Sequence, residues 1–190
     1  HDRGRRSARN GSDRVNIDQL PILLIIVPLI ASPLCVLIGN RRAVYAFSLM
    51  VTWATFAMAL VLVNKVSVTG PMHYELSGWS PDYGIEYVVD PLSGFVMTFV
   101  TGIAAIVLTY AGPGLDREIP SSHQYLFCPM YLLCMTGLLG MCITGDLFNL
   151  FVFLEISSLS SYALIALGAT RRAPLAAFQY LVAGTIGATF

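Results

Sequence analysis

Residues 145–168 form an apolar stretch of membrane length that carries one carboxylate, Glu155, near its middle. A helix that begins at Asp146 places Glu155 about 13 Å from its start, at about 1.5 Å per residue. The hydrocarbon core of a bilayer is about 30 Å thick, so Glu155 falls near the midplane. A glutamate side chain reaches neither surface from there, so protein or water inside a helical bundle must face it. An ionisable group at this depth marks a candidate functional site.

The neighbours of Glu155 follow from the rotation of about 100° per residue in a helix. The residues on its face are Phe148, Phe151, Leu159 and Tyr162, with Ser158 beside them. Ser158 and Tyr162 carry hydroxyls, so we predict that they support or relay a proton that Glu155 exchanges. Asp146 lies on the opposite face at the helix start, where a carboxylate caps free backbone amides and suits the helix dipole. We interpret Asp146 as a cap first and as a supporting residue for proton transfer second.

Composition places this helix in a membrane protein. Apolar residues make up 56% of the 190 residues and charged residues only 12%, about half the share in soluble domains. Together with several long apolar runs, this predicts an all-α polytopic membrane protein. The formal net charge is zero, so we expect no nucleic-acid partner. The four cysteines show no Cys-x-x-Cys spacing, which predicts packing roles and neither a metal site nor a cofactor.

The apolar runs predict about six membrane-spanning helices, at residues 17–39, 43–63, 91–110, 123–144, 145–168 and 174–190. We divide the chain into a disordered polar tail (1–16), a transmembrane region of four helices (17–144) and a last part that begins with the Glu155 helix (145–190). The last run ends at Phe190 within the thickness of a bilayer, so we expect a truncated piece of a longer protein.

The connections between these runs carry their own signals. Residues 64–90 are expected to be an exposed loop with a short hairpin on the membrane surface, formed by residues 73–76 and 85–89. Asp90 followed by Pro91 predicts a helix start, because aspartate caps and proline suits the first turn. Residues 40–42 are expected to be a tight charged connection, and residues 111–122, which contain two glycines and a proline near their start, a link between helices.

Charge separates the connections into two sets. The arginines of the first, third and fifth connections are Arg41, Arg42, Arg117, Arg171 and Arg172, whereas the second and fourth connections hold only Lys65. The positive-inside rule therefore predicts that the odd-numbered connections face the cytoplasm. The arginines of the polar tail would then lie on the side that the rule disfavours.

Several stretches resemble a known family. Residues 145–156 (GDLFNLFVFLEI) and 161–168 (SYALIALG) are similar to the start of the proton-conducting antiporter domain. Residues 177–190 (AFQYLVAGTIGATF) look most like the MrpD-type subunit of Mrp-type multisubunit cation/proton antiporters, and residues 88–93 (VVDPLS) match the family's N-terminal region. The family also includes the antiporter-like subunits of respiratory complex I and of membrane-bound hydrogenases. The resemblance covers about residues 17–190.

This resemblance implies that the chain is the N-terminal part of a larger antiporter-like helical bundle, whose proton-conducting domain begins near residue 145. In the family, the glutamate that aligns with Glu155 pairs with a lysine on the seventh span, which lies beyond this sequence. The resemblance also implies a hetero-oligomeric complex with other membrane subunits in the bacterial inner (plasma) membrane. The transported ions would be protons and monovalent cations, and this subunit would hold no cofactor.

Three functions remain open at this point. The first is a non-enzymatic subunit of a Na⁺/proton antiporter that carries protons through a buried glutamate relay. The second is a proton-translocating membrane subunit of an NADH:quinone oxidoreductase or hydrogenase-type complex. The third is a structural membrane subunit in which Glu155 is a protonated contact between helices, because one buried charge costs only about 3 kcal/mol on insertion scales.

Overall fold

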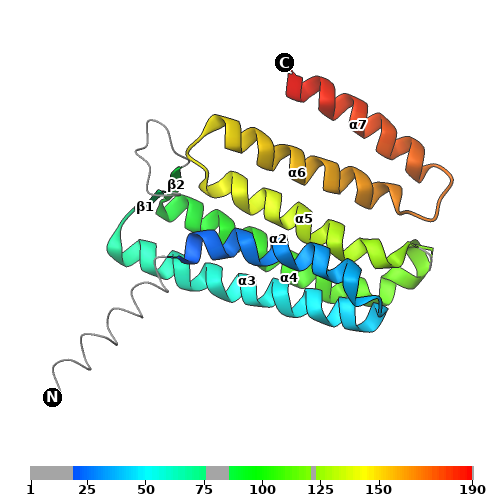
Figure 1. Cartoon of the computed structure of the whole chain (residues 1–190), viewed down its shortest axis with the longest axis horizontal. Helices are drawn as coiled ribbons and strands as arrows, with labels where there is room; N and C mark the ends of the chain where they lie inside the picture. The colour runs from blue at the N-terminus through cyan, green and yellow to red at the C-terminus, as the bar shows by residue number, and fades with distance from the viewer. Residues whose placement is uncertain (1–18, 76–85, 121–122, 190) are drawn as a thin grey trace.

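Six long helices and a two-stranded hairpin make up the described part of the chain (Figure 1), which comprises residues 19–75, 86–120 and 123–189 of this computed structural model. The elements are α2 (Leu20–Ile38), α3 (Arg41–Thr69), β1 (Met72–Glu75), β2 (Glu86–Val89), α4 (Pro91–Glu118), α5 (Gln124–Ile143), α6 (Leu147–Ala166) and α7 (Ala173–Thr189). Helices α2 to α6 are long and apolar enough to cross a membrane, and α7 is a shorter apolar helix. The predicted helical membrane fold is confirmed; the predicted tail, residues 1–16, lies outside the described residues.

The hydrophobic core lies among α2, α3, α4 and α5. Its fully buried side chains include Leu24 of α2, Leu62 of α3, Met97 of α4 and Leu132 of α5. Helix α6 packs on α5, and α7 packs on the side of α6 away from the core, as Figure 1 shows. Among the described helices, α6 therefore has α5 on one side and α7 on another.

The helix starts follow local rules, with one correction. The Asp90 carboxylate accepts a hydrogen bond of 2.6 Å from the Ser93 amide, and Pro91 begins α4 as predicted. Asn40 caps α3 by accepting from the Arg42 amide at 3.2 Å. The connection is therefore shorter than the expected residues 40–42, because Arg41 and Arg42 already belong to the first turn of α3.

The second correction concerns α4, which runs through the expected link at residues 111–122 and ends at Glu118. Tertiary contacts outweigh the local breaking signals there. Leu115 and Ile119 are buried together with Leu167 from the end of α6. The Gln124 side-chain amide donates to the carbonyls of Leu115 at 3.1 Å and Ile119 at 2.8 Å, which satisfies acceptors that a helix end otherwise leaves open.

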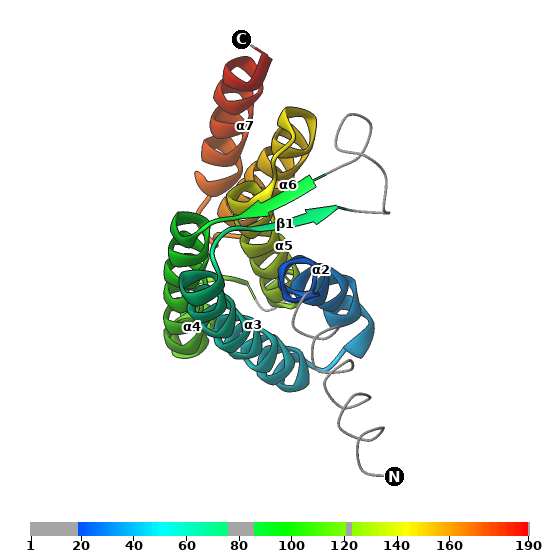
Figure 2. The ribbon, with the colours of Figure 1, turned by 90° about the vertical axis from the view of Figure 1, so that its left-hand side faces the viewer.

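The predicted hairpin is confirmed in its strands. β1 and β2 pair antiparallel, with Met72 opposite Val89 and Glu75 opposite Glu86, while the turn between them lies outside the described residues. Helix α3 continues to Thr69, so the connection before the hairpin is shorter than expected. Figure 2 looks at the hairpin end of the bundle and shows the two strands lying across it. Tyr87 of β2 forms an isolated bridge with Thr144, just before α6.

All five arginines of the odd-numbered connections lie at the opposite end from the hairpin. Figure 1 shows the α2–α3, α4–α5 and α6–α7 connections gathered on the right-hand side. Helices that alternate in direction bring every second connection to the same end, so the charge separation seen in the sequence becomes a separation in space. That this end faces the cytoplasm stays a prediction.

Candidate functional site: the Glu155 face of α6

The start of α6 is held by a network of polar groups. The Asp146 carboxylate accepts hydrogen bonds from the amides of Phe148 at 3.3 Å and Asn149 at 3.2 Å. The Asn149 side-chain amide donates to the Thr144 hydroxyl at 3.2 Å. The predicted capping role of Asp146 is thus confirmed, and its supporting role in proton transfer stays a prediction.

Helices α5 and α6 approach each other through glycines. A Cβ at Gly137 would lie 2.6 Å from the Ser157 backbone nitrogen, and a Cβ at Gly140 would overlap the Phe153 ring. Small residues allow such backbone contacts between membrane helices. This pair was not predicted from the sequence, although the Gly-x-x-Gly spacing in α5 is a detectable signal.

A line of small polar side chains follows the same interface. Ser157 and Ser160 are buried, and the Ser160 hydroxyl donates to the Ile156 carbonyl at 2.6 Å. The Ser161 hydroxyl donates to the Ser157 carbonyl at 2.8 Å and lies 3.4 Å from the Cys134 sulfur. These hydroxyls were also missed from the sequence. The Ser160 and Ser161 hydroxyls bond to carbonyls of their own helix, so both donors are satisfied without a partner on α5.

Glu155 lies on the other side of α6. Phe153 and Ser157, which face α5, are each rotated by about 160° from Glu155 around the helix. The Glu155 side chain therefore leaves α6 away from α5, and it is half-buried. It lies about 12 Å from the start of α6 and about 17 Å from its end, which places it mid-span as predicted. No hydrogen bond or ion pair joins its carboxylate to any residue that the structure describes.

Tyr162 shares the Glu155 side of α6 and meets α7. Its ring packs edge-on against Tyr180, with centroids 5.0 Å apart, and its hydroxyl occupies the space beside Gly184. Helices α6 and α7 run in opposite directions, so Glu155, seven residues earlier, lies about 10 Å further on, level with the end of α7. Helix α7 therefore covers Tyr162.

Ser158 is half-buried on the same side, one turn from Glu155. Among the described residues, no hydrogen bond links Glu155, Ser158 and Tyr162 to one another. The structure thus gathers the three predicted residues on one side of α6 without joining them.

Two groups near the hairpin end have altered acidity. Hydrogen bonds from the Ser93 hydroxyl and then from the Ser93 amide lower the pKa of Asp90. Burial raises the pKa of Tyr87, and a hydrogen bond with the Asn149 side chain opposes that rise. Tyr87 therefore connects the hairpin to the first turn of α6. Within the described ranges, no cluster of three or more histidine, cysteine or acidic side chains is placed to hold a metal ion.

Comparison with known proteins identifies relatives of this chain. No protein-family model matches it. Over 174 residues it is 45% identical to the protein named NADH-quinone oxidoreductase subunit N from Desulforudis audaxviator, covering 90% of this chain and 34% of that protein. It is 31% identical over 170 residues to the putative antiporter subunit mnhD2 of Staphylococcus aureus, covering 86% of this chain and 33% of the other.

Two solved structures share the fold. A chain of the membrane-bound sulfane sulfur reductase, an archaeal respiratory membrane complex, matches with a TM-score of 0.82 and 30% identity over 90% of this chain and 35% of that one. A chain of the Mrp complex from Dietzia matches with a TM-score of 0.81 and 25% identity over 91% of this chain and 32% of that one. The chain thus spans about a third of the length of the relatives that it matches.

These matches agree with the all-helical fold and its five candidate membrane spans. The chain is a multi-pass membrane protein of a bacterial or archaeal cell membrane. It belongs to the family of antiporter-like membrane subunits that includes the MrpD-type subunits of cation/proton antiporters and the corresponding subunits of complex I.

Proposed function

We propose that this chain carries protons across the membrane as part of an antiporter-like subunit, with Glu155 as the group that binds and releases them. One observation carries the proposal: a carboxylate lies in the middle of a membrane-length helix, on the side that α5 leaves uncovered. Burying a charge without a partner is costly, so such a group needs a proton or a cationic neighbour.

The proposed mechanism depends on whether a bound proton or a neighbouring cation neutralises Glu155. Burial favours the neutral form of a carboxyl group, and a nearby cation favours the charged form. A cationic side chain contributed by another part of the protein would therefore drive proton release when it approaches Glu155 and proton uptake when it withdraws. When that cationic side chain lies next to Glu155, the two groups titrate as a pair. Ser158 and Tyr162 are the supporting hydroxyls in this scheme, and Asp146 fixes the start of the helix.

Two couplings of this proton step are proposed. The first is exchange of protons for Na⁺ or another monovalent cation in an Mrp-type antiporter, which the likeness to the putative antiporter subunit supports. The second is redox-driven proton translocation, which the 45% identity to a protein named NADH-quinone oxidoreductase subunit N supports. In both, the chain works among other membrane subunits. Residues 17–144 form the supporting helical region, and residue 145 begins the proton-conducting part.

The test uses the complete subunit assembled in its complex, in inside-out membrane vesicles. Glu155→Gln keeps the shape of the side chain and removes its charge. Proton movement is followed with a fluorescent ΔpH probe, first on addition of Na⁺ and then on addition of NADH and quinone. The first response identifies an antiporter and the second a redox-driven subunit.

We expect Glu155→Gln to abolish proton movement while the complex still assembles, and Glu155→Asp to retain part of it. Glu118→Gln is the matched control, because it removes an exposed carboxylate at the end of α4 and should leave transport unchanged. Full transport by an assembled Glu155→Gln complex would refute the proton-carrying role.

A further inference from the structure

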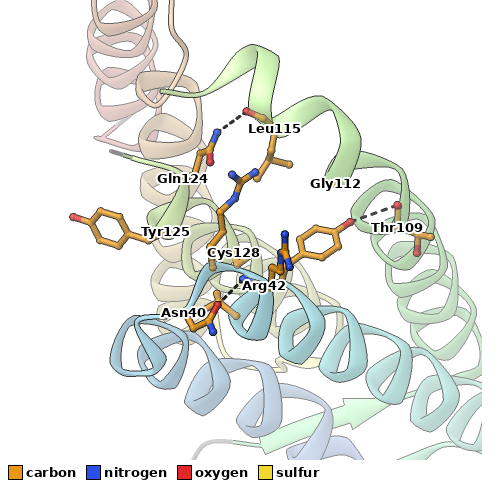
Figure 3. A pocket seen from close by; sticks show the side chains of 11 residues that line it. Asn40, Arg42, Thr109, Gly112, Leu115, Gln124, Tyr125 and Cys128 are labelled. Atoms are coloured by element: carbon orange, nitrogen blue, oxygen red, sulfur yellow. Dashed lines mark hydrogen bonds between the residues drawn. The ribbon is translucent and has the colours of Figure 1, made fainter. Parts of the chain in front are cut away.

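A cavity of about 840 Å³ opens at the arginine-rich end of the bundle, between the start of α3, the end of α4 and the start of α5 (Figure 3). This volume lies within the range of small-molecule sites. Its polar lining residues are Asn40, Arg41, Arg42, Tyr45, Thr109, Gln124 and Tyr125, and no carboxylate is among the lining residues that the structure describes. We propose that this cavity binds the phosphate of an anionic phospholipid headgroup.

The inner wall of the cavity is already fixed by hydrogen bonds to helix backbone. The Tyr45 hydroxyl donates to the Leu108 carbonyl, and the Thr109 hydroxyl donates to the Ala105 carbonyl at 2.6 Å. The Gln124 amide donates to carbonyls at the end of α4. The Tyr45 and Gln124 bonds join α3 and α5 to α4, and the Thr109 bond lies within α4, so these side chains of the cavity wall are already held in place.

The mouth of the cavity supplies the donors for an anion. Arg42 is exposed, and its guanidinium forms no ion pair with any residue in the described ranges. Figure 3 shows Asn40 beside Arg42, where the Asn40 side-chain oxygen accepts a hydrogen bond from the Arg42 backbone amide. The Asn40 side-chain nitrogen is a further donor. Arg41 adds a second positive charge. A guanidinium donates two parallel hydrogen bonds to phosphate oxygens.

The depth of the cavity favours a lipid over a soluble anion. Helix α2 ends at Ile38, the membrane-length part of α4 ends at Gly112, and α5 begins at Gln124. The cavity therefore lies at the level where apolar spans give way to polar connections, which is the level of lipid headgroups. Exposed Leu37 and Ile38 lie just before Asn40 and offer an apolar surface to acyl chains. Basic pockets between membrane helices at this depth bind anionic headgroups.

The experiment compares two charge-matched double variants of the complete subunit in its complex, purified in an uncharged detergent. Arg41→Gln/Arg42→Gln removes both charges at the cavity. Arg171→Gln/Arg172→Gln removes two exposed charges at the same end of the bundle but outside it. Native mass spectrometry then measures binding of dioleoyl phosphatidylglycerol, of dioleoyl phosphatidylcholine and of inorganic phosphate.

We expect the wild type and the Arg171/Arg172 variant to retain one more phosphatidylglycerol molecule than the Arg41/Arg42 variant. In the Arg41/Arg42 variant, the affinity of the cavity for this lipid should fall about tenfold or more. Arg42→Lys keeps the positive charge but loses the planar guanidinium group, so it should weaken phosphatidylglycerol binding by less. This variant tests the proposal if the Arg41/Arg42 double variant fails to assemble. Equal retention by the two double variants would overturn the proposal, as would equal binding of phosphatidylcholine. Displacement of phosphatidylglycerol by an equal concentration of inorganic phosphate would assign the cavity to a soluble anion instead.

Discussion

The hydroxyl of Tyr162 in α6 occupies the position that a Cβ would take at residue 184 in α7. This contact, with the edge-on packing of Tyr162 on Tyr180, fixes where α7 crosses α6. It also fixes how far α7 covers the side of α6 that carries Glu155. Glycine at position 184 is therefore a condition for the geometry of the candidate site.

We predict that Gly184→Ala destabilises the packing of α7 by about 1 kcal/mol, the low end of overpacking costs, because the new methyl group meets the end of the Tyr162 side chain, which can shift. Tyr162→Phe removes the hydroxyl that the new methyl group would meet. The double variant should therefore recover part of the loss, which a double-mutant cycle of thermal unfolding in detergent measures. Strictly additive effects of the two substitutions would show that the two side chains do not meet.

The glycine contact between α5 and α6 gives a second prediction. Gly137→Ala places a methyl group 2.6 Å from the Ser157 backbone nitrogen and 2.7 Å from the Phe153 carbonyl oxygen. Backbone atoms yield less readily than side-chain ends, so we expect a loss of about 2 kcal/mol or more in unfolding free energy.

The matched control for this prediction is Gly114→Ala in α4, where a Cβ would meet no atom within 4 Å. Alanine favours a helix over glycine by about 1 kcal/mol, so the control should be neutral or stabilising. Similar losses for the two variants would contradict the close approach of α5 and α6. Both are read from the unfolding temperature of the assembled subunit.

A third prediction concerns acid. The pKa of Asp90 is lowered in the folded chain by hydrogen bonds from Ser93, so folding favours the charged carboxylate. The stability that this carboxylate contributes is present above its ordinary pKa of 3.8. It is lost as the pH falls below that value and through the lower folded pKa.

Asp90→Asn keeps a capping oxygen and has no charge to lose. We expect the unfolding temperature of the wild type to fall more steeply between pH 5 and pH 3 (roughly the window around the Asp90 titration) than that of the variant. The measurement is a pair of melting curves in a non-ionic detergent. Parallel curves over this range would show that Asp90 does not contribute through its charge.

Local rules account for much of this structure. Asp90 with Pro91 and Asp146 with the following apolar run each begin a helix within a residue of the expected position, because capping depends only on the adjacent backbone. The strands of the hairpin were likewise predictable, since strand alternation and turn residues are local. The continuation of α4 past Gly112 was not, because it depends on Leu115 and Ile119 meeting Leu167 from a distant helix.

The same distinction applies to the candidate site. Helical periodicity was enough to place Glu155 mid-span and to put Ser158 and Tyr162 on its side of the helix. It could not indicate that Phe153 and Ser157 would face α5, or that Tyr162 would meet Gly184. Those facts depend on how side chains from different helices fit together.

Four features could be read from single segments of the chain: the membrane class, the number and order of the long helices, the grouping of the arginines and the depth of the one mid-span carboxylate. Each of these follows from hydrophobicity and periodicity along a single segment, where the bilayer sets the length and the backbone sets the rotation. The packing of the helices was needed to show which side of α6 faces α5, how closely α5 approaches, and that the arginines of α3 line a cavity with α4 and α5. These depend on steric fit between segments far apart in the chain, which no local pattern encodes.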